Sequence, residues 1–222
     1  MSPDKKTDSI TLANQGDTAI DIQASAKSWD MDEQGKFIET DIGDFVFFPR
    51  LLNIPPHQEK SIRIGYNGNF PPTEKSYRLI LEELPPVRTP EQQAKDKVNS
   101  GINWLMRLSV PMFAMPSADI PAPELKIDEV KQTTGGWSVA VRNVGQYHVY
   151  IKKLRVEMKG GTDVERAVMR ILPGRRVFIE VPVDGKSCKG ASEVTFNFTL
   201  EQQAENYPVT LPLRKDACLP SL

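Results

Sequence analysis

The sequence has little of what an enzyme or a membrane protein needs. Its 222 residues include only two histidines and two cysteines, and 28 basic residues against 29 acidic ones leave a net charge of −1. Two histidines leave little acid–base chemistry near neutral pH, and so balanced a charge gives no electrostatic reason to bind nucleic acid. No apolar run approaches the roughly 18 residues of a transmembrane helix. The composition favours a globular protein without a cofactor and without direct membrane insertion.

Catalytic and targeting motifs are also missing. The sequence contains no Gly-x-Ser-x-Gly, no phosphate-binding glycine loop and no cysteine–histidine set with metal-ligand spacing. We interpret His57 and His148 as ordinary surface or packed side chains. The first nine residues have no apolar segment of the kind a signal peptide carries. We therefore expect no enzymatic activity, and no signal peptide within this chain.

The two cysteines, Cys188 and Cys218, both lie in the C-terminal half. A disulfide between them would close a loop of about 30 residues and contribute roughly 3–4 kcal/mol in the chain-entropy model. It would also imply an oxidising compartment. Two unpaired thiols are the alternative, and spacing alone does not decide between them.

Alternation of apolar and polar residues dominates the chain, and helical periodicity is nearly absent. Short strands at roughly 8–12-residue spacing predict an all-β protein built from sandwiches. Asn-x-Gly recurs at Asn14 and Asn143, and a proline turn precedes an alternating strand at Pro55 and Pro173. We therefore predict two similar domains, residues 1–116 and 124–222, joined by a proline-rich linker at 117–123.

Residues 101–116 form the most unusual stretch. In a strand, alternate side chains share a face, and here one face carries only apolar residues. These are Ile102, Trp104, Met106, Leu108, Val110 and Met112. Pro111 has no amide hydrogen and indicates a sheet edge. Proteins normally blunt a long apolar edge, so we predict that this edge pairs with another chain; an ordinary core strand is the alternative.

Arg78 is the second unusual residue. It lies on the alternating strand of Tyr77, Leu79 and Leu81, and points away from the core together with Ile80. A fixed arginine binds a carboxylate through paired, charge-assisted hydrogen bonds. A solvated arginine on an outer face is the alternative.

Several segments together resemble the periplasmic chaperones of the chaperone–usher pilus pathway. The resemblance spans most of residues 8–116, whereas the second half is similar only in size and strand rhythm. The segments are Asn14-Gln-Gly-Asp, Trp29 before a polar loop, Phe48-Pro-Arg, IPPHQEKSIRI at 54–64, EKSYRLILEELP at 74–85 and LSVPMFAMP at 108–116.

This resemblance implies two immunoglobulin-like β-sandwich domains set at an angle, in a protein of the periplasm. It implies that the last strand of the first domain is lent to a pilus subunit that lacks a strand, and that the subunit is then delivered to an outer-membrane usher. The row matches the donor positions of that strand at Ile102, Trp104, Met106, Leu108 and Val110.

The chain also departs from the family pattern. The family begins with a further strand stretch whose arginine holds the subunit's terminal carboxylate, and we expect that first strand to be truncated here. The better-known branch has a lysine on the donor strand where Pro111 stands when the chains are aligned on Phe113. Arg78 lies where the divergent archaic branch has an arginine. The resemblance therefore implies Arg78 as the carboxylate anchor, with Arg107 as the second candidate.

Two other functions are compatible with the same strands. A two-domain adhesive or surface protein would use residues 102–112 as an ordinary core strand, and a carbohydrate-binding sandwich or an enzyme would need a polar cluster elsewhere. Pairing of two copies of the free protein through their exposed edges is a further possibility that the sequence leaves open.

Overall fold

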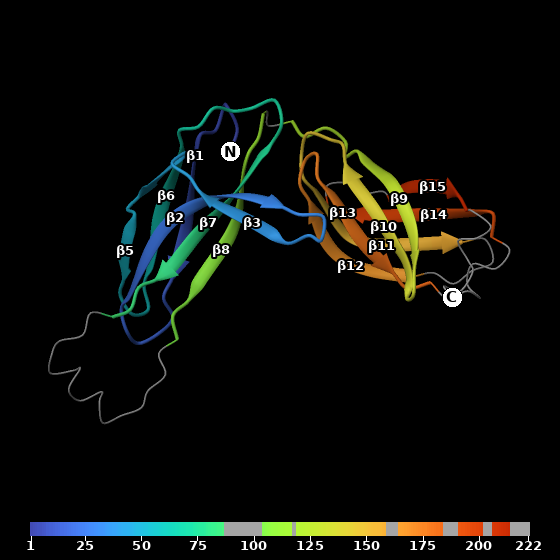
Figure 1. The fold of residues 1–222 in the computed structure, drawn as a ribbon. Helices are drawn as coiled ribbons and strands as arrows, with labels where there is room; N and C mark the ends of the chain where they lie inside the picture. The colour runs from blue at the N-terminus through green and yellow to red at the C-terminus, as the bar shows by residue number, and fades with distance from the viewer. Residues whose placement is uncertain (87–103, 117–118, 159–163, 184–190, 202–205, 214–222) are drawn as a thin grey trace, which may run out of the picture. The chain divides into compact units, whose positions relative to one another are not determined.

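The computed structural model describes residues 1–86, 104–116, 119–158, 164–183, 191–201 and 206–213, with backbone alone for 164–168. Every regular element in these ranges is a β-strand, and all the strand pairs with a defined register are antiparallel (Figure 1). The all-β prediction is confirmed. The described part of the chain contains no helix long and apolar enough to cross a membrane.

The chain forms two compact units. The first holds residues 1–29, 39–71 and 75–118, and the second holds residues 30–38, 72–74 and 119–222. The units are not two continuous halves of the sequence, because two short segments of the N-terminal half, residues 30–38 and 72–74, belong to the second unit. Two of their contacts are the pairing of Arg175 with Asp30, at 2.6 Å from both Nε and Nη2, and of His148 Nδ1 with Glu74, at 2.9 Å.

Two sheets make up the sandwich of the first unit. One has the order β1-β6-β4, and the other has the order β3-β2-β7-β8, with β5 paired to the start of β2. The strands are β1 (Thr7–Ala13), β2 (Ile20–Met31), β3 (Phe37–Asp41), β4 (Phe45–Phe48), β5 (Leu51–Ile54), β6 (Glu59–Tyr66), β7 (Lys75–Glu83) and β8 (Arg107–Ala114).

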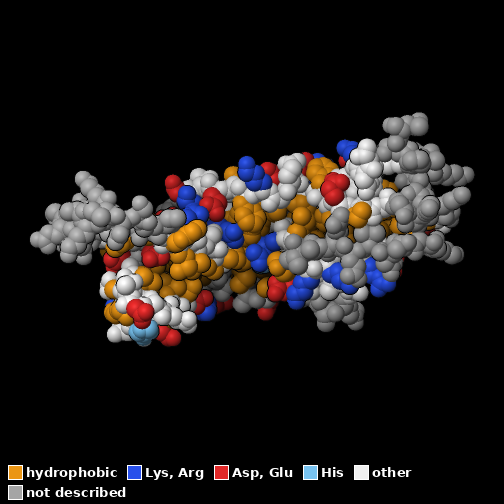
Figure 2. Space-filling model, turned by 90° about the horizontal axis from the view of Figure 1, so that it is seen from below, with side chains coloured by type: hydrophobic (Ala, Val, Ile, Leu, Met, Phe, Trp, Pro, Cys, Tyr) orange, Lys and Arg blue, Asp and Glu red, His pale blue; other side chains and the backbone are white. Residues whose placement is uncertain are grey.

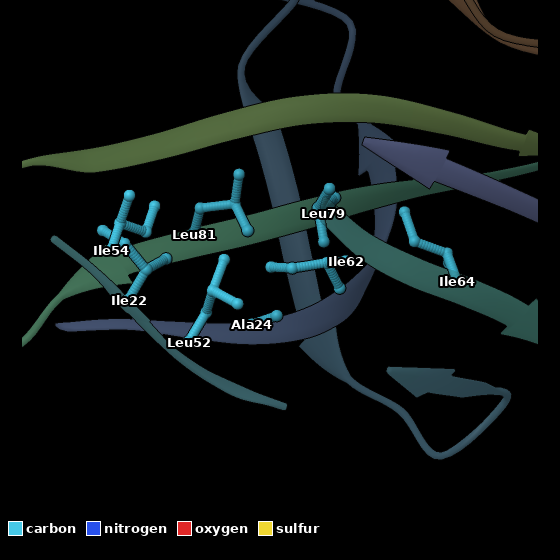
Figure 3. Packing of buried hydrophobic residues seen from close by; sticks show 8 residues of the cluster. All are labelled: Ile22, Ala24, Leu52, Ile54, Ile62, Ile64, Leu79 and Leu81. Atoms are coloured by element: carbon cyan, nitrogen blue, oxygen red, sulfur yellow. The ribbon is translucent and has the colours of Figure 1, made fainter. Parts of the chain in front are cut away.

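The core of the first unit lies between these sheets. Alternation places one side chain in two on the inner face, and those of β2, β5, β6 and β7 meet there (Figure 3). The buried cluster consists of Ile22, Ala24, Leu52, Ile54, Ile62, Ile64, Leu79 and Leu81. Val110 and Met112 of β8 are only partly buried against it. The core therefore thins out toward β8.

The second unit is also a sandwich of two sheets, ordered β13-β10-β9 and β12-β11-β14-β15. Its core contains three large aromatic side chains that are almost completely buried, Trp137, Phe196 and Phe198. The strands are β9 (Leu125–Thr133), β10 (Gly136–Asn143), β11 (Val149–Met158), β12 (Val164–Ile171), β13 (Arg176–Val181), β14 (Glu193–Leu200) and β15 (Tyr207–Pro212).

A buried asparagine closes the turn after the first strand. Asn14 Nδ2 donates hydrogen bonds to the backbone oxygens of Thr18 (2.8 Å) and Ile54 (3.0 Å), and its Oδ1 accepts one from Gly16 N (3.0 Å). These bonds tie the turn to the end of β5. A buried amide group is stable only when its donors and acceptors are paired in this way.

Asn143 makes the same set of bonds in the second unit. Its Nδ2 donates to the backbone oxygens of Tyr147 (2.7 Å) and Ile171 (3.0 Å), and its Oδ1 accepts from Gly145 N (3.0 Å). The recurrence of Asn-x-Gly in the sequence therefore marks equivalent turns in two sandwiches of one kind.

Candidate functional site

The strand β8 lies at the edge of the larger sheet of the first unit. Among the described strands it pairs only with β7, with Leu108 opposite Leu81 and Pro111 opposite Arg78. In Figure 1, β8 lies beside β7, and its edge that faces away from β7 is the margin of the sheet. Pro111 indicated this edge position in the sequence, and the prediction is confirmed.

The apolar row is longer than the strand that carries it. The sequence predicts a strand from Ile102 onward, but β8 begins at Arg107, so the prediction is wrong for residues 104–106. Its partner β7 ends at Glu83, and the N–H of Glu83 donates to Met106 O at 2.9 Å. Pro85 and Pro86 follow and have no N–H with which to continue the pairing. Among the described residues, no strand pairs with residues 104 and 105. Ile102 lies outside the described residues.

Exposure falls steadily along the row. Trp104 is 87% exposed, Met106 49% and Leu108 42%, whereas Val110 and Met112 are partly buried against the core of their own sandwich. Figure 2 shows hydrophobic side chains gathered on the underside of the first unit. An ordinary core strand would bury all of these side chains, whereas here the C-terminal half of the row is partly buried and the rest is exposed.

The backbone groups of β8 alternate between its partner and the open edge. The bond from Glu83 to Met106 O shows that even-numbered residues direct their N–H and C=O groups toward β7. Odd-numbered residues therefore direct theirs outward. The outward positions are Arg107, Ser109, Pro111 and Phe113.

The open part of this edge ends near Pro111. Pro111 has no N–H to donate. Beyond it, Met1 N donates to Phe113 O at 2.7 Å, and Met115 N donates to Met1 O at 2.8 Å. A partner strand therefore finds outward backbone groups from Arg107 to Pro111.

The two sheets do not close against each other beside β8. A cavity of about 320 Å³ is lined by residues of β1, β6, β7 and β8, among them Ile10, Ile64, Leu79, Val110 and Met112. Both β1 and β8 are edge strands of their sheets. The seam between them is thus an apolar opening next to the exposed row.

Tyr77, which pairs with Met112 of β8, is a buried and uncharged side chain on the inner face of the sheet. Its hydroxyl lies 3.1 Å from that of Tyr66 and donates to Asp44 Oδ2 at 3.1 Å. Burial, together with the hydrogen bond to Tyr66, raises the pKa of Tyr77 well above its ordinary value. The phenol therefore stays neutral at all physiological pH values.

Arg78 lies on the opposite, outer face of the same sheet. Its side chain is only 13% exposed, and its guanidinium carbon lies 4.6 Å from the ring centroid of Trp29. Trp29 also packs with Phe113, at 6.1 Å between ring centroids. The alternative interpretation of Arg78 as a solvated side chain is therefore wrong: the aromatic ring holds a largely buried cation.

Glu39 of β3 brings the two predicted arginines together. Its Oε1 lies 3.9 Å from Arg78 Nε, and its Oε2 lies 3.8 Å from Arg107 Nη2. Arg107 is more exposed, and its Nε donates to Glu82 Oε1 at 2.8 Å. Sequence reasoning identified both arginines but missed Glu39, because nothing in the spacing of β3 and β7 indicates that their outer faces share a contact.

The remaining predicted residues do not add to this site. Cys188 and Cys218 lie outside the described residues. His57 is exposed beside Asp17, with 3.0 Å between Nε2 and Oδ1, and His148 pairs with Glu74. The described residues include no group of three or more His, Cys, Asp and Glu side chains placed to hold a metal ion.

Three solved structures illustrate the similarity of the whole chain to known proteins. The complex of the chaperone CsuC with the tip adhesion subunit CsuE, from archaic Csu pili of Acinetobacter baumannii, matches with 20% identity and a TM-score of 0.64, covering 95% of this chain and 93% of that one. The SafB chaperone complex with the SafA pilin of Salmonella enterica matches with 15% identity, a TM-score of 0.60, and 96% and 91% coverage. The CupB2 chaperone of Pseudomonas aeruginosa matches with 16% identity, a TM-score of 0.56, and 96% and 95% coverage.

These likenesses show the fold, which is a pair of immunoglobulin-like sandwiches. Comparison with curated protein sequences finds no match. Residues 1–119, more than half of the chain, match the family of pili and flagellar-assembly chaperones through its PapD N-terminal domain. That stretch contains β8, the seam and Arg78. This chain belongs to the pili and flagellar-assembly chaperone family.

Proposed function

We propose that this protein is a periplasmic chaperone of the archaic branch, which lends β8 to a pilus subunit and delivers the subunit to an outer-membrane usher. The observation that carries the proposal is the edge position of β8, with outward backbone groups and an exposed apolar row beside an open seam. Family membership supports the same class of client, as do the pilus subunits with which CsuC and SafB form complexes.

Two kinds of contact would act at once. A client strand laid along β8 pairs with the outward backbone groups from Arg107 to Pro111. The side chains of the row, including Trp104, Met106 and Leu108, fill the gap in the core of the client. Burial of a large apolar side chain gives roughly 1.5–3 kcal/mol, and the costs of association offset part of that gain. The client's own folding supplies the energy, so neither nucleotide nor catalysis is needed.

The anchor for the client's terminal carboxylate is Arg78 in this proposal. A client strand loses its backbone partners at Pro111, and Arg78 stands directly opposite Pro111 in the β7–β8 pairing. A strand running parallel to β8 therefore ends at the level of Arg78. Arg107 lies at the other end of β8, opposite Glu82, so it remains the second candidate.

Coexpression tests the donor role of β8. A pilus subunit from the same genome that copurifies with the wild-type protein should be lost with Leu108→Asp, because the variant places an unpaired charge in the client's apolar groove. Leu108 is 42% exposed, so the free variant should remain folded. Val46→Asp, at an exposed apolar position on β4 (52%), is the matched control and should keep the subunit. Equal recovery with wild type and Leu108→Asp would contradict the assignment.

A further inference from the structure

The contacts of Glu39 with the two arginines are loose. The separations of 3.9 Å to Arg78 Nε and 3.8 Å to Arg107 Nη2 are those of ion pairs. Charge-assisted hydrogen bonds between such groups are about 2.7–2.9 Å long. These two contacts thus neutralise charge without the short, directed bonds that an arginine makes with a well-placed carboxylate.

Arg78 has a second support that does not depend on Glu39. Its guanidinium stacks on Trp29, which in turn packs with Phe113 of β8. Stacking on an aromatic ring fixes the plane of the guanidinium independently of the carboxylate that it faces. The position of the cation is therefore maintained if the glutamate moves away.

We propose that Glu39 occupies, in the free protein, the place of the client's terminal carboxylate and is displaced when the client binds. This inference rests on the proposed function, since it requires a client that ends at Arg78. Glu39 is then an internal competitor: it lowers the net affinity for the client and favours the later release of the subunit.

Two further features fit an exchange of carboxylates. Ser109 Oγ is buried on the same outer face, diagonal to Arg78, and no described residue hydrogen-bonds to it. A buried hydroxyl without an acceptor is unfavourable, and an incoming carboxylate would supply one. Glu39 is 24% exposed on β3, which is the other edge strand of the sheet. Its side chain can therefore turn to solvent without leaving a buried charge.

A competition experiment tests the proposal. Wild-type protein and Glu39→Gln carry different affinity tags and are coexpressed with a pilus subunit from the same genome, and the subunit recovered with each is measured. Because loosely held, partly exposed ion pairs contribute little, we expect the Gln variant to take about three- to fivefold more subunit than wild type. With a subunit extended by two C-terminal glycines, which move the carboxylate, the advantage should disappear.

Glu82→Gln is the matched control. It removes the same charge next to Arg107, at 2.8 Å from Nε, but has no ion pair with Arg78. Its expected ratio to wild type is close to one. If Glu39→Gln recovers the same amount of subunit as wild type, or less, the proposal is overturned. Recovery below that of wild type would mean that Glu39 positions Arg78 instead. An advantage that persists with the extended subunit would also overturn it. Absence of any complex with wild type would instead refute the proposed function.

Discussion

The last strands of the two units, β8 and β15, occupy the same place in their sheets but present different edges. Each lies at the margin and pairs with the preceding strand. Directly after β15, Leu213 N donates to Ser192 O, so odd-numbered residues of β15 direct their backbone groups toward β14 and even-numbered ones direct theirs outward. The outward positions are Pro208, Thr210 and Pro212.

Proline at an outward position removes an N–H that a foreign strand would need. In β15 this happens at Pro208 and Pro212, and only Thr210 retains the donor. In β8 only Pro111 lacks it. The two units have the same kind of sandwich, but the edge of β15 lacks most of its outward N–H donors, whereas the edge of β8 keeps most of them. The edge that keeps them lies in the unit that matches the family.

The strongest test concerns what the two units share. Asn143→Ala should lower the free energy of unfolding by about 3 kcal/mol, because the buried carbonyl of Ile171 and its neighbours lose their donor. Asn14→Ala should have a similar cost. Urea unfolding followed by tryptophan fluorescence measures both. Asn53→Ala, at an exposed side chain paired with Asp21, is the control and should change stability little. A large cost at only one asparagine would show that the turns are not equivalent.

The next test concerns the anchor, which only the first unit has under the proposed function. Arg78→Ala should weaken client binding by about 1.5–3 kcal/mol, or roughly tenfold to a hundredfold, because a charge-assisted pair is lost. Binding is measured by titration of purified subunit complexes against a competing chaperone. Arg63→Ala, an exposed arginine on β6, controls for the loss of charge. Unchanged affinity in Arg78→Ala would remove it as the anchor.

A matched pair of proline substitutions tests the two edges themselves. Ser109→Pro removes an outward N–H from β8, together with the buried hydroxyl, and should weaken client binding at least about three- to tenfold, the value of one backbone hydrogen bond. The sandwich of the free protein should survive, since this N–H does not face β7. Thr210→Pro makes the same change in β15 and should leave client binding unaltered. Equal effects of both would argue against β8 as the donor.

The smallest effect is expected from opening the blunted edge. Replacing both Pro208 and Pro212 by threonine restores outward N–H groups in β15 and should produce weak self-association. Sedimentation at increasing protein concentration would detect it as a small rise in average mass. A strictly monomeric double variant would show that something other than proline protects this edge.

Much of the architecture was predictable because it depends on local patterns. Alternation identified the strands around Leu79 and Leu81, Asn-x-Gly identified equivalent turns, and Pro111 identified an edge. The start of β8 was not predictable. It depends on where its partner β7 ends, at Glu83, which is a long-range property of the sheet.

The site divides in the same way. The sequence identified Arg78 and the row, since an unusual residue on a regular strand is visible in one dimension. It did not reveal that Arg78 stacks on Trp29 or that Glu39 reaches both arginines, because these contacts join strands that are far apart in the chain. The roles of Ile102, Trp104, Met106, Leu108 and Val110 as donors, and of Cys188 and Cys218 as a disulfide, stay predictions.

The sequence by itself determined the strands, their apolar faces and the missing N–H groups of the prolines, because each is a property of neighbouring residues. Only the tertiary structure decided which strand lies at a margin, which face of it is covered and which carboxylate meets which arginine. Hydrogen bonding in a sheet and packing between sheets connect residues many positions apart, and the order of the strands is set by the sum of those contacts.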